Sequence, residues 1–202
     1  MIIDYKKVRS ISTEPYKKDF NYDGYTAPLD NTHQFADERG NNGEHYKLLT
    51  YLSNMFDGIT ILDVGTNWGD SAISLSQNKN NKVISYDIMH IWNFPFAKDY
   101  ANLEFKLMDI NDEDPEIIKS AKLIFFDIAH DGVQEQKFTD MLERIGYKGY
   151  VLCDDINLPW APWMKVWWDG LQIEKYDITD IGHTWGTGLL NYYQDGNIQI
   201  IK

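Results

Sequence analysis

The stretch GITILDVGTNWGDS, residues 58–71, is typical of a buried strand that runs through a glycine-containing turn into a helix. The segment 58–64 is mostly apolar, as expected for a strand covered on both faces of a sheet. Asp63, Gly65 and Gly69 then mark the turn. Glycine has no Cβ, so a backbone there can adopt unusual dihedral angles and approach a ligand closely. The segment therefore predicts the first strand–turn–helix unit of an α/β fold.

The rest of the chain repeats this alternation. Strands are predicted at 58–64, 82–88, 103–110, 122–129 and 149–155, and helices at 43–56, 70–78, 114–121 and 132–146. Strands that alternate with helices form a parallel sheet with right-handed crossovers. Three further strands, at 174–179, 186–193 and 197–202, have no helices between them, and QDGN at 194–197 favours a hairpin turn. We therefore expect a mostly parallel, Rossmann-like sheet with an antiparallel C-terminal end.

Composition limits the domain organisation and the partners. The chain has 202 residues, of which 43% are hydrophobic, enough for one globular domain over 43–202. Residues 1–42 show no periodic pattern of hydrophobic residues and predict an irregular arm or lid. The single cysteine, Cys153, favours a reducing compartment, and no apolar run suggests a signal peptide or a membrane span. The net charge of -12 disfavours nucleic acid and fits a neutral or cationic ligand or a metal. A cytoplasmic location is expected.

Acidic residues follow the first three predicted strands. In open parallel sheets, ligands bind beyond the carboxyl ends of the strands. The first loop has Asn67 where a dinucleotide-binding pattern has its middle glycine, which disfavours a nicotinamide dehydrogenase. Asp87 ends the second strand, where an acid typically bonds ribose hydroxyls, and Asp109 ends the third. Each acid alone is equally well explained as a turn residue or helix cap; together with the glycine loop they favour a nucleoside-containing cofactor.

The D-x-G-x-x-x-G pattern from Asp63 to Gly69 resembles motif I of the class I S-adenosylmethionine methyltransferases. The resemblance implies their Rossmann-like fold and S-adenosylmethionine as cofactor, with Asp109 near its adenine amino group. Glu44 is expected to bind the ammonium group of the cofactor or to cap the following helix. The predicted cofactor-binding residues are Glu44, Asp63, Gly65, Thr66, Asn67, Gly69, Ser71, Asp87, Ile88, Asp109 and Asp127.

Three further acids follow the fourth and fifth predicted strands, namely Asp127, Asp154 and Asp155. Neighbouring parallel strands end side by side, so these carboxylates are expected to converge and to need a cation between them. Oxygen ligands without a cysteine or histidine cluster favour Mg²⁺, Mn²⁺ or Ca²⁺. The alternative is that Asp154 and Asp155 only start a loop and cap the next helix.

This arrangement resembles the metal-dependent O-methyltransferases of the catechol and macrolide-sugar types. They carry Asp after strand four and Asp-Asn or Asp-Asp after strand five, at an interval close to that from Asp127 to Asp154. The resemblance covers roughly residues 43–193 and implies that the metal binds the acceptor hydroxyl and lowers its pKa. It fails at Ala129, where some members place a catalytic Asp, so the predicted general base is His130 or Asp131, with His183 in reserve.

Several tryptophans follow the loop that contains Asp154 and Asp155. Trp160 and Trp163 predict a sugar-stacking wall, Trp167 a helix face packed in the core, and Trp185 a further acceptor contact. Residues 175–188 resemble the tail of methyltransferases found with glycan-building enzymes, including multidomain proteins of bacteria and large DNA viruses. The resemblance implies a sugar hydroxyl as acceptor, fusion to glycosyltransferase domains or a homo-oligomer, and the host cytoplasm for a viral protein. The alternatives are a catechol-like or other small-molecule diol and a non-catalytic binding subunit.

Overall fold

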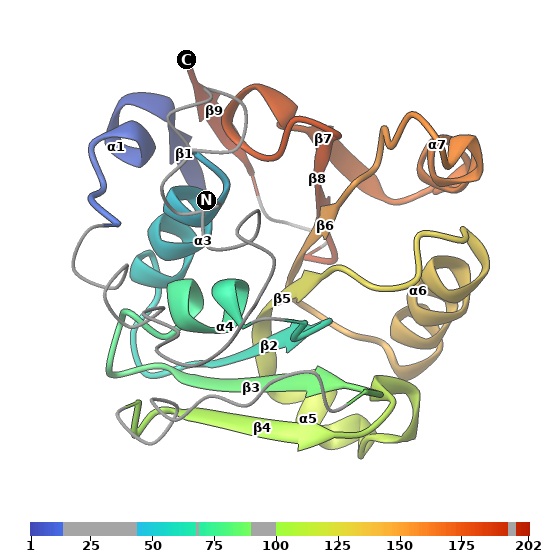
Figure 1. The fold of residues 1–202 in the computed structure, drawn as a ribbon, viewed down its shortest axis with the longest axis horizontal. Helices are drawn as coiled ribbons and strands as arrows, with labels where there is room; N and C mark the ends of the chain where they lie inside the picture. The colour runs from blue at the N-terminus through green and yellow to red at the C-terminus, as the bar shows by residue number, and fades with distance from the viewer. Residues whose placement is uncertain (14–43, 68, 90–99, 194–196) are drawn as a thin grey trace, which may run out of the picture.

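The computed structural model describes residues 1–13, 44–67, 69–89, 100–193 and 197–202. Its centre is a seven-stranded sheet in the order β4-β3-β2-β5-β6-β8-β7, in which β8 runs antiparallel to both of its neighbours (Figure 1). The strands are β2 Thr60–Val64, β3 Lys82–Asp87, β4 Leu103–Leu107, β5 Ala121–Phe126, β6 Tyr150–Asp154, β7 Glu174–Asp177 and β8 Thr187–Asn191. The predicted Rossmann-like sheet with an antiparallel end is confirmed.

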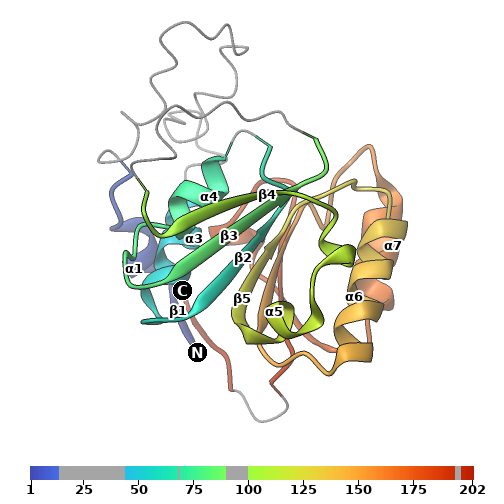
Figure 2. The same cartoon turned by 90° about the horizontal axis from the view of Figure 1, so that it is seen from below.

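Helices cover both faces of this sheet, which gives three layers (Figure 2). One face carries α3 His45–Asn54 and α4 Asp70–Leu75, with α1 Tyr5–Arg9 beside them. The other face carries α5 Pro115–Ser120, α6 Val133–Ile145 and α7 Pro162–Gly170. Short 3₁₀ turns lie at Ile110–Asp112 and Thr179–Ile181.

The hydrophobic core has two layers, one on each face of the sheet, because successive side chains along a strand point to opposite faces. In β2, Ile61 packs in the cluster with Leu48 and Leu49 of α3, whereas Leu62 packs in the cluster with Phe138 of α6. Phe125 and Phe126 of β5 divide in the same way. The strands are therefore apolar on both faces, which is why the segment 58–64 reads as an almost continuous apolar run.

The ends of the chain differ from the prediction. Ile2–Asp4 forms strand β1 and Tyr5–Arg9 forms α1, although 1–42 was expected to be irregular; residues 14–43 lie outside the described residues. The C-terminal strand β9, Gln199–Ile201, pairs in parallel with β1 in a separate two-stranded sheet. The predicted hairpin that would pair 186–193 with 197–202 is therefore wrong, because β6 and β7 already occupy both edges of β8.

The order of strands reverses between β2 and β5, which lie side by side in the middle of the sheet. The chain continues from β2 toward β3 and β4 on one side and from β5 toward β6 on the other. The loops after β2 and β5 therefore diverge and leave a crevice at the carboxyl ends of these strands, the usual ligand site of open α/β sheets.

Candidate functional site

A cavity of about 1020 Å³ lies at the carboxyl ends of the parallel strands. Ligand pockets are typically roughly 300–1,000 Å³, so this one is large enough for a cofactor together with a second molecule. Its walls come from the loops after β2, β3, β4, β5 and β6, from the start of α3, and from residues 183–185 before β8. Among the predicted site residues, the wall includes Gly65, Thr66, Asn67, Ser71, Asp87, Ile88, Asp109, Asp127, His130, Asp131, Asp154, Asp155, His183 and Trp185.

The loop after β2 is held tightly against its neighbours. Gly65 has φ +102°, its N–H donates to the carbonyl of Tyr86 at 2.9 Å, and a Cβ there would lie 1.6 Å from the carbonyl oxygen of Asp127. Only glycine fits this position. Asn67 also has a positive φ, +43°, and its N–H donates to the Asp87 carboxylate at 2.9 Å. Asp87 thus fixes the loop and lines the cavity at the end of β3, as a ribose clamp requires.

Asp63 does not line the cavity. Its side chain is fully buried below the loop and accepts a hydrogen bond from Ser85 Oγ, while its other oxygen has no hydrogen-bond partner. Burial raises the pKa of Asp63 to about 7. The acid that reaches the cavity from this loop is Asp70, the first residue of α4, whose pKa burial and the nearby Asp63 raise to about 8.

The raised pKa of Asp63 predicts a loss of stability as the pH rises. Below the pKa of an unfolded aspartate both states bind the proton, and between about pH 4 and the folded-state pKa of about 7 only the folded state keeps it. Stability should fall by about 1.4 kcal/mol per pH unit over that window. We expect Asp63→Asn to melt like the wild type near pH 4 and at a higher temperature than it near pH 8. The same substitution at the exposed Asp57 should shift neither value, and equal melting curves for Asp63→Asn and wild type at pH 8 would contradict the prediction.

Of the other predicted cofactor-binding residues, some line the cavity and others do not. Glu44 does not line the cavity and makes no side-chain cap; it pairs with Arg9 at 3.3 Å, so neither of its two predicted roles is seen. Gly69, with φ +86°, precedes α4 without contributing to the cavity wall. Asp109 lines the cavity and accepts two hydrogen bonds from Asn111, at 2.8 and 2.7 Å. Ser71 and Ile88 lie in the wall as predicted.

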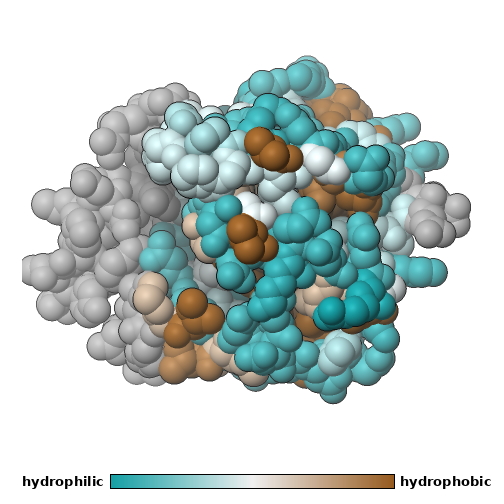
Figure 3. Space-filling view, turned by 90° about the vertical axis from the view of Figure 1, so that its right-hand side faces the viewer, coloured by the Kyte–Doolittle hydropathy of each residue, from teal (hydrophilic) through white to brown (hydrophobic). Residues whose placement is uncertain are grey.

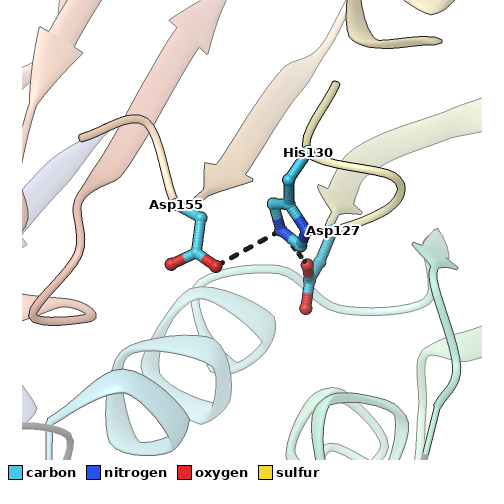
Figure 4. A group of neighbouring side chains, drawn as sticks. All are labelled: Asp127, His130 and Asp155. Atoms are coloured by element: carbon cyan, nitrogen blue, oxygen red, sulfur yellow. Dashed lines mark ion pairs between the residues drawn. The ribbon is translucent and has the colours of Figure 1, made fainter. Parts of the chain in front are cut away.

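The loops after β5 and β6 bring Asp127, His130 and Asp155 together, with the imidazole between the two carboxylates (Figure 4). His130 Nε2 lies 2.9 Å from an Asp127 oxygen and 3.3 Å from an Asp155 oxygen. Although burial alone would lower the pKa of His130, the two carboxylates raise it. The predicted convergence of acids is therefore present, but a histidine stands among them.

Two more histidines surround the other carboxylate, Asp154. His183 Nδ1 bonds to Asp155 at 2.8 Å and lies 3.5 Å from Asp154. His45, at the start of α3, is buried, and its Nδ1 lies 3.9 Å from Asp154. Burial raises the pKa of Asp154 well above its usual value, and the charges of Asp127 and Asp155 raise it further.

The donor atoms fit a divalent ion. Ligands around an octahedral ion at about 2.1 Å lie ~3 Å from one another, which matches the spacings among Asp127, His130 and Asp155. His130 Nε2 is buried and, despite these short distances, has no partner in hydrogen-bonding geometry. One oxygen of Asp154 is also buried without a partner. These buried atoms lie close together without hydrogen bonds to one another, which fits ligands of a shared cation.

Backbone strain is concentrated at the same place. In the described part of the chain, three residues other than glycine have a positive φ: Asn67, His130 and Asp155. All three line the cavity. Such conformations cost of order 1–3 kcal/mol each and persist only where the surroundings enforce them, which happens most often at functional sites.

No protein-family model matches the chain, and no curated protein matches it in sequence. Many solved structures match its fold. The chain has the class I methyltransferase fold.

Three of the similar structures contain a bound cofactor or its product. The SAH-bound methyltransferase PaMTH1 of Podospora anserina has a TM-score of 0.58 and 13% identity, over 95% of this chain and 86% of that one. The O-methyltransferase TomG of Streptomyces achromogenes, involved in tomaymycin synthesis and in complex with SAM, has a TM-score of 0.55 and 15% identity, over 72% and 78%. An O-methyltransferase of Bacillus cereus in complex with SAH has a TM-score of 0.52 and 14% identity, over 72% and 78%.

Within this methyltransferase fold, Asp131 is placed as a helix cap. Its carboxylate accepts hydrogen bonds from the N–H groups of Val133 and Gln134, both at 2.8 Å, at the start of α6. These bonds stabilise the charged form and lower the pKa of Asp131. A carboxylate held in this way is a poor proton acceptor, so the geometry disfavours Asp131 as the general base.

The tryptophans divide between the core and the surface. Trp167 is buried, as predicted. Trp185 lines the cavity, and its ring makes edge contacts with His183 and with the exposed Trp160. Trp163 is half-exposed and outside the cavity wall. Figure 3 shows the side of the molecule that carries α6 and α7: hydrophilic residues cover most of it, and hydrophobic ones lie in small separate groups.

The sequence prediction missed His45 and Asp70 as cavity residues. His45 follows Glu44 directly, and the alternation of polar and apolar residues around it gives no sign that its ring faces the ends of β5 and β6. Asp70 looks like an ordinary acidic residue in the first turn of a helix. Asp70 follows the loop glycine Gly69 directly, at the start of a helix, and this position was the signal that could have found it.

Proposed function

We propose that the chain is an S-adenosylmethionine-dependent O-methyltransferase that acts on a sugar hydroxyl with the help of a divalent metal ion. The observation that carries the proposal is the group of Asp127, His130 and Asp155, whose ligand atoms all lie within 4.8 Å of one another on the wall of the cavity of a methyltransferase fold. The similar structures that contain SAM or SAH support the choice of cofactor.

The cofactor side of the cavity is formed by the loops after β2, β3 and β4. Gly65 and Asn67 shape the first loop, Asp87 is available for ribose hydroxyls, and Asp109 for the adenine amino group. Asp70, in the first turn of α4, lines the cavity and is available for the ammonium group of the cofactor. When bound, S-adenosylmethionine supplies the methyl group.

The metal side is formed by the loops after β5 and β6. Asp127, His130 and Asp155 would hold the ion, and Asp154 lies directly behind them. Because the set contains an imidazole nitrogen, it suits Mn²⁺ better than Ca²⁺ or Mg²⁺, which prefer oxygen ligands throughout. When bound, such an ion lowers the pKa of a hydroxyl group that it contacts.

His183 is the best candidate for the general base. Asp155 holds its Nδ1 at 2.8 Å, which orients the ring and leaves Nε2 as the nitrogen that can accept a proton. Its ring is 13% exposed and lines the cavity, whereas His130 Nε2 is buried between carboxylates. The reserve candidate of the sequence analysis thus has the better geometry, and His130 acts as a ligand.

The acceptor is expected to enter beside Trp185 and Trp160, whose rings form an edge-to-face pair with centroids 4.7 Å apart at the rim of the cavity. Aromatic rings of this kind stack on the apolar faces of sugars. No lysine or arginine is among the lining residues that the structure describes, while carboxylates are numerous. A neutral acceptor such as a glycoside fits this wall better than a phosphorylated one, and a catechol-like diol is the second candidate.

The test is a methyl-transfer assay with S-adenosylmethionine labelled in its methyl group and Mn²⁺. A panel of uncharged mono- and disaccharide glycosides, the corresponding sugar phosphates and a set of catechols should be compared at equal concentration. Label should appear in the glycosides. Transfer only to catechols would replace the acceptor class, and binding of S-adenosylmethionine without transfer to any hydroxyl would favour the non-catalytic binding subunit.

A further inference from the structure

His130 is held in its left-handed conformation from both sides of its backbone. Its φ is +54°, a conformation that costs a residue with a Cβ roughly 1–2 kcal/mol. Its N–H donates to Glu135 Oε1 at 2.8 Å, and its carbonyl accepts a short hydrogen bond from the indole N–H of Trp163. The two bonds together compensate for the strain and fix the direction of the imidazole.

Both partners of His130 come from helices that pack on the sheet. Glu135 is in the first turn of α6 and is only 1% exposed, so its carboxylate cannot relax into solvent. Trp163 is in the first turn of α7. A Cβ on Gly132 would lie 3.2 Å from the carbonyl oxygen of Trp163, so the loop after β5 and the start of α7 are in direct contact. The position of His130 therefore depends on α7, which contributes no residue to the cavity wall.

We propose that Trp163 is a positioning residue for the metal site. Through the main-chain carbonyl of His130 it places the imidazole between Asp127 and Asp155. The indole ring of Trp163 is 49% exposed, which on its own suggests a surface for stacking, but its N–H is bound to the loop and its ring lies outside the cavity wall. The inference rests on the proposed metal-dependent function, because it gives Trp163 a role only through His130.

The decisive variant is Trp163→Phe, which keeps an aromatic ring and removes only the N–H donor. Partners that orient a metal-ligating histidine typically contribute 10- to 100-fold to metal affinity. We expect Trp163→Phe to weaken Mn²⁺ binding about 10-fold in calorimetric titration, with the affinity for S-adenosylmethionine unchanged and the melting temperature lowered only by the loss of one hydrogen bond. Trp160→Phe is the matched control: it changes an exposed tryptophan that makes no bond to the loop, and Mn²⁺ affinity should stay at the wild-type value.

Trp163→Phe in a His130→Ala background distinguishes a positioning role of Trp163 from direct contact of its ring with the acceptor. Because Trp163 is inferred to act through the imidazole, Trp163→Phe should have no further effect on Mn²⁺ affinity when the imidazole is absent. An equal loss in both backgrounds, or a rise in the acceptor KM with unchanged Mn²⁺ affinity, overturns the inference in favour of acceptor stacking. Wild-type protein that binds no Mn²⁺ overturns the proposed metal and this inference together, whereas wild-type binding that Trp163→Phe leaves unchanged overturns this inference alone.

Discussion

Removal of divalent ions should abolish methyl transfer, and Mn²⁺ should restore it. The physical reason is the charge of the site: Asp155 lies with Asp127 in one group of ligand atoms and with Asp154 in a second, and burial and the charges of Asp127 and Asp155 raise the pKa of Asp154 well above its usual value. Without an ion, the hydroxyl of a sugar keeps a pKa far above neutral and is a poor nucleophile. We expect turnover to fall to background after dialysis against EDTA and to recover with added Mn²⁺, more fully than with Mg²⁺ or Ca²⁺.

Two aspartates of the loop after β5 provide a variant and its control for this turnover assay. Asp127→Asn should reproduce the effect of chelation, because it removes a charged ligand, whereas Asp131→Asn, four residues along the same loop, should retain activity, since Asp131 bonds the start of α6 and not the ion group. Metal binding should also raise the melting temperature in proportion to the logarithm of the free Mn²⁺ concentration. Full turnover in exhaustively chelated protein would refute the metal and leave the acids as partners of the histidines.

Local patterns in the sequence were sufficient for the main sheet and for the acids at its edge. The end of a strand can be predicted from neighbouring residues alone. An apolar run that stops at Asp87 or Asp127 places that carboxylate at the carboxyl end of a strand. Parallel neighbours then bring these ends together. This is why the convergence of Asp127 with Asp155 was predictable without a structure.

The sequence named His130 and His183 as candidate bases, but the contacts of the histidines with the acids were not predictable in the same way. His45, His130 and His183 come from the start of α3, the loop after β5 and the segment before β8, and only the tertiary fold brings them to the same carboxylates. The sequence argument for a hard, all-oxygen metal site assumed that the acids had no basic neighbours. Because the histidines are those neighbours, the expected ion changes from a Mg²⁺-like to a Mn²⁺-like preference.

The C-terminal strand shows a second limit of local reasoning. QDGN is a strong hairpin signal, but whether two segments pair depends on which strand edges are free. Both edges of β8 are occupied, by β6 and β7, so β9 pairs with β1 at the other end of the sequence. No pattern within 186–202 contains that information. The termini of the chain thus form one small sheet, with the N-terminal ammonium of Met1 donating to the carbonyl of Asn197 at 2.9 Å.

Replacement of His183 by alanine should cut turnover by about 10²- to 10⁴-fold, the usual contribution of a general base. The reason is its geometry: the Asp155 carboxylate holds Nδ1 at 2.8 Å, and the ring of Trp185 contacts it edge-on with centroids 5.1 Å apart, so the imidazole has a fixed direction at the cavity wall. Added imidazole should restore part of the rate.

Binding measurements on the same variant decide whether His183 is a base or a ligand. As a base, it does not contact the ion or the cofactor, so His183→Ala should keep wild-type affinity for S-adenosylmethionine and lose turnover even at saturating Mn²⁺. Its Mn²⁺ affinity should fall by no more than the contribution of a hydrogen-bond partner of Asp155, about 10- to 100-fold. Recovery of wild-type turnover at saturating Mn²⁺ would instead assign His183 to the ion together with Asp154 and Asp155, the second set of ligand atoms within 4.8 Å of one another. Turnover close to the wild-type value, with unchanged affinities for Mn²⁺ and S-adenosylmethionine, would show that His183 takes no part in the reaction. Its bond to Asp155 and its place in the cavity wall would then not serve proton transfer.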